Sequence, residues 1–232
     1  MKKKLVFLTG AGVSAESGIS TFRDADGLWE KYPVMQVCSA TGFAADPALV
    51  HKFYNERRCQ LLDVKPNAAH LAIAALEKDY DVMVVTQNVD NLHEAAGTPE
   101  EHIIHLHGEL MKVRSTRDES KLFTLTPDNL ETTPDTVIEG HHVRPHIVFF
   151  EEAVPMIEPA AKVVSEADIL VIIGTSLNVY PAAGLIHYAR PDAAIFYIDP
   201  KPAAVGSRVR VIAEPATKGM QTLVEELKKL NL

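Results

Sequence analysis

The sequence predicts an α/β protein built around a doubly wound parallel sheet. Three observations predict this class: short apolar runs, helical patterns between them, and a glycine-rich turn directly after the first run. The runs are rich in β-branched residues and nearly continuous, as in parallel strands that are covered on both faces. The predicted strands cover residues 5–8, 82–86, 146–150, 169–173 and 194–198. Strands that alternate with helices in this way are typical of doubly wound sheets.

The helices are predicted from apolar residues spaced three and four positions apart. The clearest pattern is at residues 217–230, where one stripe contains Met220, Leu223, Val224, Leu227 and Leu230. Further helices are predicted at residues 67–78, 159–166 and 181–189. Two segments do not fit the alternation of strands and helices. Residues 25–62 begin with a loop and are otherwise largely helical in pattern. Residues 111–143 are polar and irregular.

Composition and charge exclude several classes of protein. The 232 residues carry a net charge of −8, which argues against the basic surface of a nucleic-acid-binding protein. No apolar run approaches the roughly 20 residues of a membrane span. The basic start, Met1-Lys2-Lys3-Lys4, leads directly into the first predicted strand rather than into a signal peptide. We therefore expect a cytoplasmic protein that binds neither nucleic acid nor membrane.

The two cysteines, Cys38 and Cys59, do not form a C-x-x-C motif. They predict neither a disulfide framework nor a thiolate zinc site. We expect both to be small side chains that are buried or half-buried.

The turn after the first strand has the sequence GAGVSAESG at residues 10–18. Gly10 and Gly12 let the backbone turn tightly and approach a pyrophosphate, and a helix starting here would present free N–H groups to it. The dinucleotide fingerprint is G-x-G-x-x-G, whereas the third glycine comes late in this chain, at Gly18. The motif alone leaves two interpretations, a cofactor site and an ordinary turn.

Polar residues also follow other predicted strands at their carboxyl ends, where open α/β sheets bind ligands. Asn88 and Asp90 follow the second strand, and Asp199 follows the last. Gly174-Thr175-Ser176 follow the fourth. Amides, hydroxyls and carboxylates at these positions suit contacts with ribose or phosphate. An Asx turn at Asn88 is the alternative.

Four motifs follow one another along the chain: GAGVSAESGISTFR at residues 10–23 with DGLW at 26–29, TQNVD at 86–90, HLHGE at 105–109, and GTS at 174–176. In this order the chain resembles the sirtuin family of NAD-dependent protein-lysine deacylases, from about residue 5 to residue 216. The resemblance implies one sirtuin domain over residues 1–232, with a Rossmann-like core at about 1–24, 63–110 and 144–232. Insertions at about 25–62 and 111–143 would form a smaller domain, with the substrate in the cleft between them.

The resemblance also implies roles for individual residues. His107 matches the catalytic base, a role that suits a neutral imidazole near pH 7, whereas His105 does not match it and is expected to be structural. Gln87, Asn88 and Asp90 would bind nicotinamide and its ribose, with Asn88 counted as catalytic. The other expected NAD contacts are Gly10, Ala11, Gly12, Ser14, Ala15, Glu16, Thr21, Phe22, Arg23, Trp29, Val89, Gly174, Thr175, Ser176, Asp199 and Ala216. Asp199 is a small departure, because sirtuins commonly have Asn there.

Tyr54 and Arg57 indicate the kind of acyl group. Three positions apart on a helix, they share one face, and a phenol and a guanidinium together can bind a carboxylate. In an isolated helix they would be read as a half-buried Tyr and a surface Arg. Within a sirtuin, the pair resembles the class that removes succinyl and malonyl groups from acyl-lysine proteins or peptides. Such a reaction consumes NAD and gives nicotinamide and 2′-O-acyl-ADP-ribose.

Two segments depart from the sirtuin pattern. Most sirtuins bind a structural zinc with four cysteines after the His-Gly motif, but residues 111–143 contain none, and Ser115 stands near the first expected position. We therefore predict that zinc is absent and that this segment is mobile. A metal site made by Asp118, His141 and His142 is the alternative. The core of the segment would include Leu122, Phe123 and Leu125.

The second departure is Glu151, where sirtuins usually have glycine. It lies in a loop that would pair with the substrate peptide as an added strand, with Val148 and Phe150 as contacts. A charged residue there would alter the peptide preference.

Two other functions would use the same residues. ADP-ribosyl transfer to protein would place a side chain where the acyl oxygen reacts, and a non-catalytic sensor of NAD or acyl-lysine would fit the missing zinc cysteines. Asn88, Asp90 and His107 favour catalysis, and the pair Tyr54 and Arg57 favours deacylation. A hydride-transfer dehydrogenase would leave all motifs beyond the glycine turn unexplained. The sequence predicts no oligomeric state.

Overall fold

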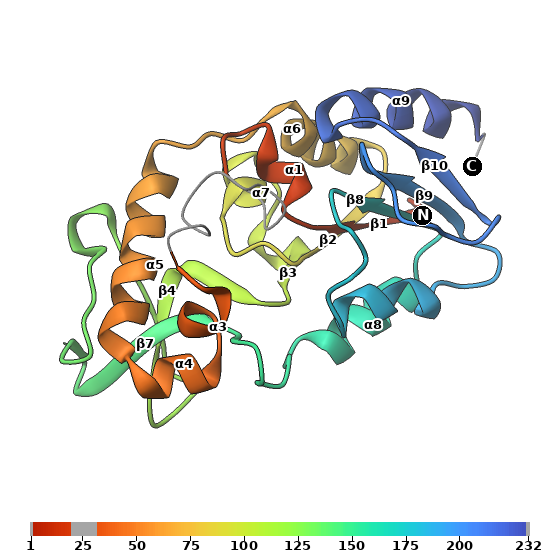
Figure 1. Cartoon of the computed structure of the whole chain (residues 1–232). Helices are drawn as coiled ribbons and strands as arrows, with labels where there is room; N and C mark the ends of the chain where they lie inside the picture. The colour runs from red at the N-terminus through yellow and green to blue at the C-terminus, as the bar shows by residue number, and fades with distance from the viewer. Residues whose placement is uncertain (1, 20–31, 231–232) are drawn as a thin grey trace.

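The larger sheet of the computed structural model is parallel and lies between layers of helices (Figure 1). The structure describes residues 2–19 and 32–230, and within them this sheet has six strands in the order β10-β9-β8-β1-β2-β3. Their bounds are β1 (Lys4–Thr9), β2 (Asp81–Thr86), β3 (Ile103–His105), β8 (Ile169–Ile173), β9 (Ala194–Ile198) and β10 (Val209–Ile212). The chain order reverses between β1 and β8, which creates a crevice at their carboxyl ends. The predicted α/β class is confirmed.

Helices cover both faces of this sheet because successive residues of a strand point to opposite sides. In β1, Leu5 and Phe7 belong to one apolar cluster, and Val6 and Leu8 to the other. All four are fully buried, which is why the strand reads as a continuous apolar run. The covering elements are α6 (Ala68–Ala75) and α9 (Ala216–Lys229) on the first face, and α8 (Ile157–Ser165) and the 3-10 helix η4 (Ala182–Tyr188) on the second.

A second, antiparallel sheet lies beside the first, with strand order β5-β4-β7-β6 (Figure 1). Its strands are β4 (Gly108–Ser115), β5 (Leu122–Thr124), β6 (Val137–Ile138) and β7 (His141–Ile147). The helices α3 (Val34–Val37), α4 (Ala40–Ala45) and α5 (Pro47–Leu62) pack against it. The remaining short elements of the described residues are α1 (Gly12–Ala15), α7 (Leu92–Ala95), η1 (Leu76–Lys78), η2 (Glu100–His102) and η3 (Pro127–Asn129).

Local signals explain where the longer helices begin. The Asp46 carboxylate accepts a hydrogen bond from the Leu49 N–H at 2.9 Å, and Pro47 occupies the first turn of α5, where no intrahelical donor is needed. Asn67 caps α6 in the same way, with its side-chain oxygen 2.9 Å from the Ala69 nitrogen. Both helices therefore begin at residues whose side chains satisfy free N–H groups.

Some sequence predictions were wrong. Residues 146–150 are not a strand of the parallel sheet: β7 ends at Ile147, and Phe150 makes only an isolated bridge to Ser39. Ile147 and Phe149 are buried against α5, and apolarity alone does not tell which sheet a strand joins. The helix predicted at residues 181–189 is present as a 3-10 helix over Ala182–Tyr188. Cys59 is exposed, so its predicted burial was wrong.

The segment 111–143 is also more regular than predicted, because it contains β5, β6, most of β4 and the beginning of β7. Burial alternates along β7, so only one of its faces is covered and its sequence reads as polar. Val113, Leu125, Leu130 and Val143 form the core here, with Phe123 packed against them. Leu122 is 45% exposed, so its predicted core position was wrong.

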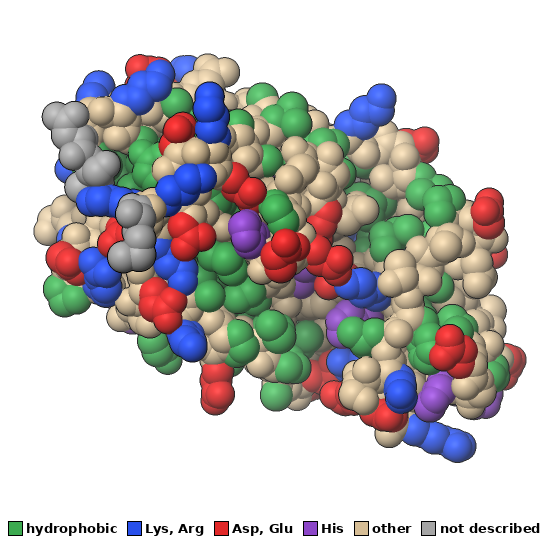
Figure 2. Space-filling model, turned by 180° about the vertical axis from the view of Figure 1, so that it is seen from behind, with side chains coloured by type: hydrophobic (Ala, Val, Ile, Leu, Met, Phe, Trp, Pro, Cys, Tyr) green, Lys and Arg blue, Asp and Glu red, His purple; other side chains and the backbone are tan. Residues whose placement is uncertain are grey.

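Among the helices of residues 2–19 and 32–230, none is both long and apolar enough to cross a membrane. Acidic and basic side chains are interspersed over the face that Figure 2 shows.

The junction between the two sheets predicts one steric effect. Gly108 has φ +84°, and a Cβ there would overlap the His146 carbonyl oxygen, whereas Gly140 has φ +82° and open space around it. We expect Gly140→Ala to cost about 1–2 kcal/mol of unfolding free energy for the left-handed backbone alone. Gly108→Ala should cost about 2 kcal/mol more, because the overlap cannot be relieved by a rotamer change. Urea unfolding of both variants measures this, and equal losses would contradict it.

Candidate active site

A cavity of about 630 Å³ opens over the carboxyl ends of β1, β2, β8 and β9, and α5 and the segment after β7 also contribute to its wall. The residues predicted from the sequence come together there. The lining includes Gly10, Ala11, Gly12, Ser14, Ala15, Glu16, Tyr54, Arg57, Gln87, Asn88, Val89, Asp90, His107, Val148, Phe150, Gly174, Thr175, Ser176, Asp199 and Ala216. Thr21, Phe22, Arg23 and Trp29, which were also predicted, lie outside the described residues.

Backbone contact between two glycine loops forms the floor of the crevice. The Gly12 N–H donates to the Gly174 carbonyl at 2.8 Å, and a Cβ on Gly12 would lie 2.6 Å from the Gly174 Cα. Gly174 itself has φ +65°, a backbone conformation that glycine adopts without strain. The glycines are therefore required for the loops after β1 and β8 to meet, in addition to any contact with a ligand.

Three polar side chains on the cavity wall, which follow β1 and β2 in the chain, are hydrogen-bonded to one another. The Asn88 amide donates to the Ser14 hydroxyl at 3.1 Å, and that hydroxyl donates to the Asp90 carboxylate at 3.0 Å. The other Asp90 oxygen accepts from the Leu92 N–H at 3.1 Å. Burial raises the pKa of Asp90, and the bonds from Leu92 and Ser14 lower it in part. The amide and the carboxyl are thus held in fixed orientations at the cavity.

His107 is arranged as a neutral base. Its Nδ1 lies 3.0 Å from the Gln87 carbonyl oxygen, which can only accept a hydrogen bond, so Nδ1 carries the proton. The lone pair is then on Nε2. Burial lowers the pKa of His107, and the Gln87 carbonyl only partly offsets this effect. The ring is therefore mostly unprotonated at pH 7 on a residue that lines the cavity.

Tyr54 and Arg57 line the same cavity from α5, on the shared face that their spacing predicted. Burial raises the pKa of Tyr54 well above its ordinary value, so the phenol keeps its proton. Burial lowers the pKa of Arg57, but a guanidinium remains charged at neutral pH. This part of the wall therefore has a hydroxyl donor beside a partly buried cation.

Sequence reasoning missed several lining residues near this pair, among them Cys38 and Gln60. The Cys38 sulfur lies 3.4 Å from the Tyr54 hydroxyl oxygen, and no sequence pattern marks this cysteine as a cavity residue. Gln60 also lines the cavity. It follows Arg57 by three positions on the same helix face, so the helical period could have identified it.

The segment 148–152 forms another part of the wall and is tied to its surroundings. The Phe150 N–H donates to the Cys38 carbonyl at 2.7 Å. Glu151 has φ +76°, unusual for a residue with a side chain, and its carboxylate accepts bonds from the Thr41 N–H at 2.9 Å and the Thr41 hydroxyl at 2.8 Å. These two bonds fix Glu151 in the conformation that a glycine would adopt freely.

The residues of the antiparallel sheet do not fit a zinc site. The Ser115 hydroxyl accepts bonds from the Arg117 and Asp118 N–H groups, at 3.1 and 3.2 Å, and lies 3.1 Å from the His141 Nδ1. Ser115 therefore closes a turn by hydrogen bonding. Within residues 2–19 and 32–230, no three His, Cys, Asp or Glu side chains are grouped to hold a metal ion, whereas structural zinc needs four ligands.

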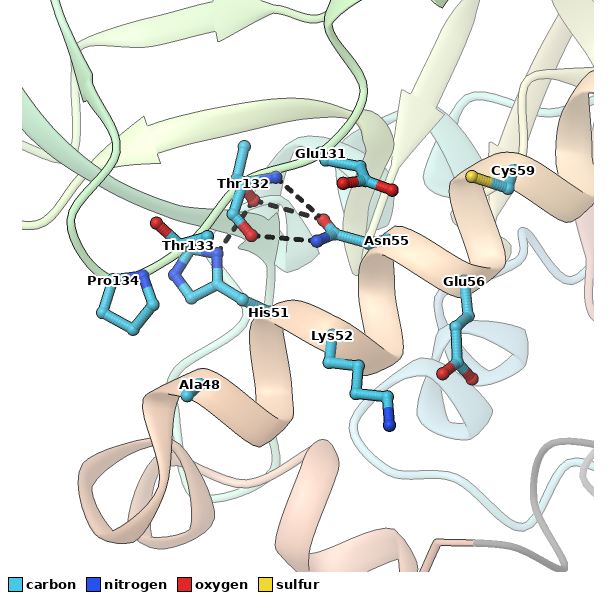
Figure 3. A pocket seen from close by; sticks show the side chains of 10 residues that line it. All are labelled: Ala48, His51, Lys52, Asn55, Glu56, Cys59, Glu131, Thr132, Thr133 and Pro134. Carbon is cyan, nitrogen blue, oxygen red and sulfur yellow. Dashed lines mark hydrogen bonds between the residues drawn. The ribbon is translucent and has the colours of Figure 1, made fainter.

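A second hollow, of about 580 Å³, lies beside α5 and the segment before β6 (Figure 3). Asn55 donates to the Thr132 carbonyl at 2.9 Å and accepts from the Thr132 N–H at 3.0 Å. The His51 Nδ1 lies 2.8 Å from the Thr132 hydroxyl. These polar groups are used to attach α5 to the neighbouring segment, which is a structural role.

The hydrogen-bonded turn at Ser115 predicts that folding needs no metal. We expect elemental analysis to find much less than one zinc per chain, and EDTA to leave the midpoint of thermal unfolding unchanged, because no ligand set would be lost. Stoichiometric zinc, or a fall in the midpoint with EDTA that added zinc reverses, would contradict the prediction.

Comparisons with known proteins agree with this geometry. Residues 10–181 match the model of the Sir2 family. A relative from Bacteroides thetaiotaomicron, named NAD-dependent protein deacylase, is 56% identical over 98% of this chain and 97% of its own length. A relative of the same name from Helicobacter pylori is 51% identical over 97% of both chains.

Solved structures give the same result. A crystal structure of a Sir2 homologue in complex with NAD has a TM-score of 0.85 and 37% identity, covering 99% of this chain and 91% of that one. A Sir2 homologue variant in complex with ADP-ribose has a TM-score of 0.87 at 37% identity, covering 99% and 93%. By its sequence and by its fold, the chain belongs to the Sir2 family.

Proposed function

We propose that this protein is an NAD-dependent protein-lysine deacylase that prefers succinyl and malonyl groups and also accepts acetyl groups. Family membership and the names of the relatives support the deacylase activity. One observation carries the acyl preference: Tyr54 and Arg57 line the same cavity as Asn88, Asp90 and His107. An acyl group whose carbonyl reacts near His107 would extend a distal carboxylate toward the cation on α5.

The residues present fit NAD. The glycine loops after β1 and β8 allow close approach of a diphosphate, and hydroxyls at Ser14, Thr175 and Ser176 line the same crevice. Gln87, Asn88 and Asp90 would hold nicotinamide and its ribose. Asp199 would bond the ribose of the adenosine half, next to Ala216. NAD, when bound, would supply the ribose carbon that loses nicotinamide and the ribose hydroxyl that takes up the acyl group.

His107 would act as the general base. Its Nδ1–H is fixed by the Gln87 carbonyl, so the Nε2 lone pair is available to take a proton from a ribose hydroxyl. The lowered pKa keeps this form populated at neutral pH. Asn88, held through Ser14, would orient the ribose for this step.

The acyl preference follows from charge and desolvation. A succinyl or malonyl carboxylate can accept charge-assisted hydrogen bonds from Arg57 and from the Tyr54 hydroxyl, whereas an acetyl group has no acceptor at that distance. Such a bond contributes about 1.5–3 kcal/mol, or a factor of about 10–150 in transition-state binding. The peptide would lie along Val148 and Phe150.

We further propose that the cleft separates a Rossmann-like core, at about residues 1–24, 63–110 and 144–232, from a small zinc-free domain, at about 25–62 and 111–143. The parallel sheet belongs to the first part, and most of the antiparallel sheet to the second.

Replacing the base tests the mechanism. His107→Ala should lower kcat at least about 100-fold while NAD binding stays within a few-fold, because general base catalysis contributes about 10²–10⁴. Nicotinamide release and calorimetry measure the two quantities. His102→Ala, which removes a histidine that does not line the cavity, is the control and should match the wild type. Near-normal turnover of His107→Ala would overturn the assigned role.

Replacing the cation tests the acyl preference. The wild type should turn over succinyl- and malonyl-lysine peptides faster than the matched acetyl peptide, with nicotinamide release and peptide mass as readouts. Arg57→Met should lower kcat/KM for the acidic acyl groups by about 10-fold or more and spare acetyl. Lys52→Met removes an exposed cation that lines the second hollow instead, and should change neither rate. Equal losses of kcat/KM on acetyl and succinyl peptides would contradict the proposal.

A further inference from the structure

His105, expected from the sequence to be structural, holds the loop that carries the predicted nicotinamide contacts. Its Nδ1 lies 3.2 Å from the Asn88 carbonyl oxygen, and its Nε2 lies 2.7 Å from a Glu94 carboxylate oxygen. The imidazole is nearly buried, with 8% of the side chain exposed. The ring therefore connects the end of β3, the loop after β2 and the helix α7.

The backbone of that loop is held at four successive carbonyls by residues 105–110. The Thr86 and Val89 carbonyls accept from the backbone N–H groups of Leu106 and Leu110, at 2.9 and 2.7 Å. Between them, the Gln87 carbonyl accepts from His107 and the Asn88 carbonyl from His105. The two histidines thus take the place of backbone donors and hold the stretch of backbone from which the Gln87 and Asn88 side chains extend.

Both partners of the His105 ring are acceptors, which fixes its charge. A neutral imidazole has one N–H, so only the imidazolium can donate to the Asn88 carbonyl and to Glu94 together. Burial lowers the pKa of His105, but the hydrogen bond and charge of Glu94, the charge of Glu109 and the Asn88 carbonyl outweigh it and leave the pKa raised.

The other titratable groups around the ring do not oppose this charge. Those that act on His105 are Glu94 and His93 of α7, Asp90 of the loop before it, Glu109 of β4 and His146 of β7. Burial lowers the pKa values of His93 and His146, so both are neutral near pH 7. The charged groups that act on His105 itself are acidic, and the nearby cation Lys112 of β4 is paired with Glu109 and also acts on Glu94.

We propose that His105, clamped as a cation between Glu94 and the Asn88 carbonyl, is a positioning residue that fixes the loop for NAD binding. The proposal rests on the proposed contact of Asn88 with NAD. His105 acts through Asn88 and does not itself line the cavity.

The two bonds of the His105 ring, to Glu94 and to the Asn88 carbonyl, are called the clamp from here on. The clamp makes the affinity for NAD depend on pH. As the pH rises through the pKa of His105, the ring loses one N–H and can keep only one of its two bonds. The Asn88 carbonyl then loses its fixed donor, and NAD binding weakens on the alkaline side. Glu94→Gln replaces the competing acceptor with an amide that can donate to Nε2. The neutral ring can then keep its Nδ1–H on the Asn88 carbonyl, so the alkaline weakening should disappear.

Calorimetric titration with NAD from pH 6.5 to 9.5 tests the clamp. We expect wild-type NAD binding to weaken by about 10-fold toward the alkaline end, the effect of losing one charged hydrogen bond, and Glu94→Gln to show no such weakening. The control is Glu77→Gln, which removes the carboxylate of another His–Glu pair. In that pair the Glu77 carboxylate lies 3.1 Å from the His102 Nδ1, and neither residue lines the cavity. It should follow the wild-type profile.

A second variant keeps the test valid if Glu94→Gln folds poorly. His105→Gln can donate to the Asn88 carbonyl without titrating, so its NAD affinity should be flat across the same range. An alkaline weakening in His105→Gln equal to wild type, or identical profiles for the Glu94 and Glu77 variants, would overturn the clamp. Failure of the wild type to bind NAD at any pH would instead overturn the proposed function.

Discussion

The cavity depends on one constraint, the meeting of two backbone loops at the point where the strand order reverses. β1 and β8 are neighbours in the parallel sheet, and the loops that follow them touch through Gly12 and Gly174. Any side chain at Gly12 would push these loops apart. Because the loops meet, Ser14 reaches Asn88 and Asp90 from the next strand, and the polar wall is assembled before a ligand binds.

The second sheet provides the other wall, and a buried arginine attaches α5 to it. Arg58 is fully buried, and its guanidinium donates to the Leu110 carbonyl at 2.8 Å, the Asn55 side-chain oxygen at 2.7 Å and the Leu130 carbonyl at 3.2 Å. The bonds to Nε and Nη1 offset part of the cost of burying this cation, although its Nη2 is buried without a hydrogen-bond partner. Helix α5 is therefore fixed on the sheet, and Tyr54 is held at the cavity by the same contacts.

The sequence predicts the parallel sheet and the cavity residues better than it predicts the second sheet. Strands covered on both faces give continuous apolar runs, and the motif residues after them occupy neighbouring strand ends. The antiparallel strands are covered on one face, so the segment around Val113 and Val143 reads as irregular although both residues are buried. The partners of His105 depend on tertiary contacts with Glu94 and the Asn88 carbonyl, which no local pattern encodes.

Adjacent arginines of α5 have opposite surroundings: Arg57 lines the cavity, whereas Arg58 is buried against the antiparallel sheet. Neighbouring helix positions differ by about 100° in direction, so both placements depend on one helical register. Substitutions can change either residue separately, but an insertion or deletion of one residue before Arg57 would rotate both at once. The evolution of this helix should therefore proceed by replacement at constant length, and length variation should be confined to the connections outside it.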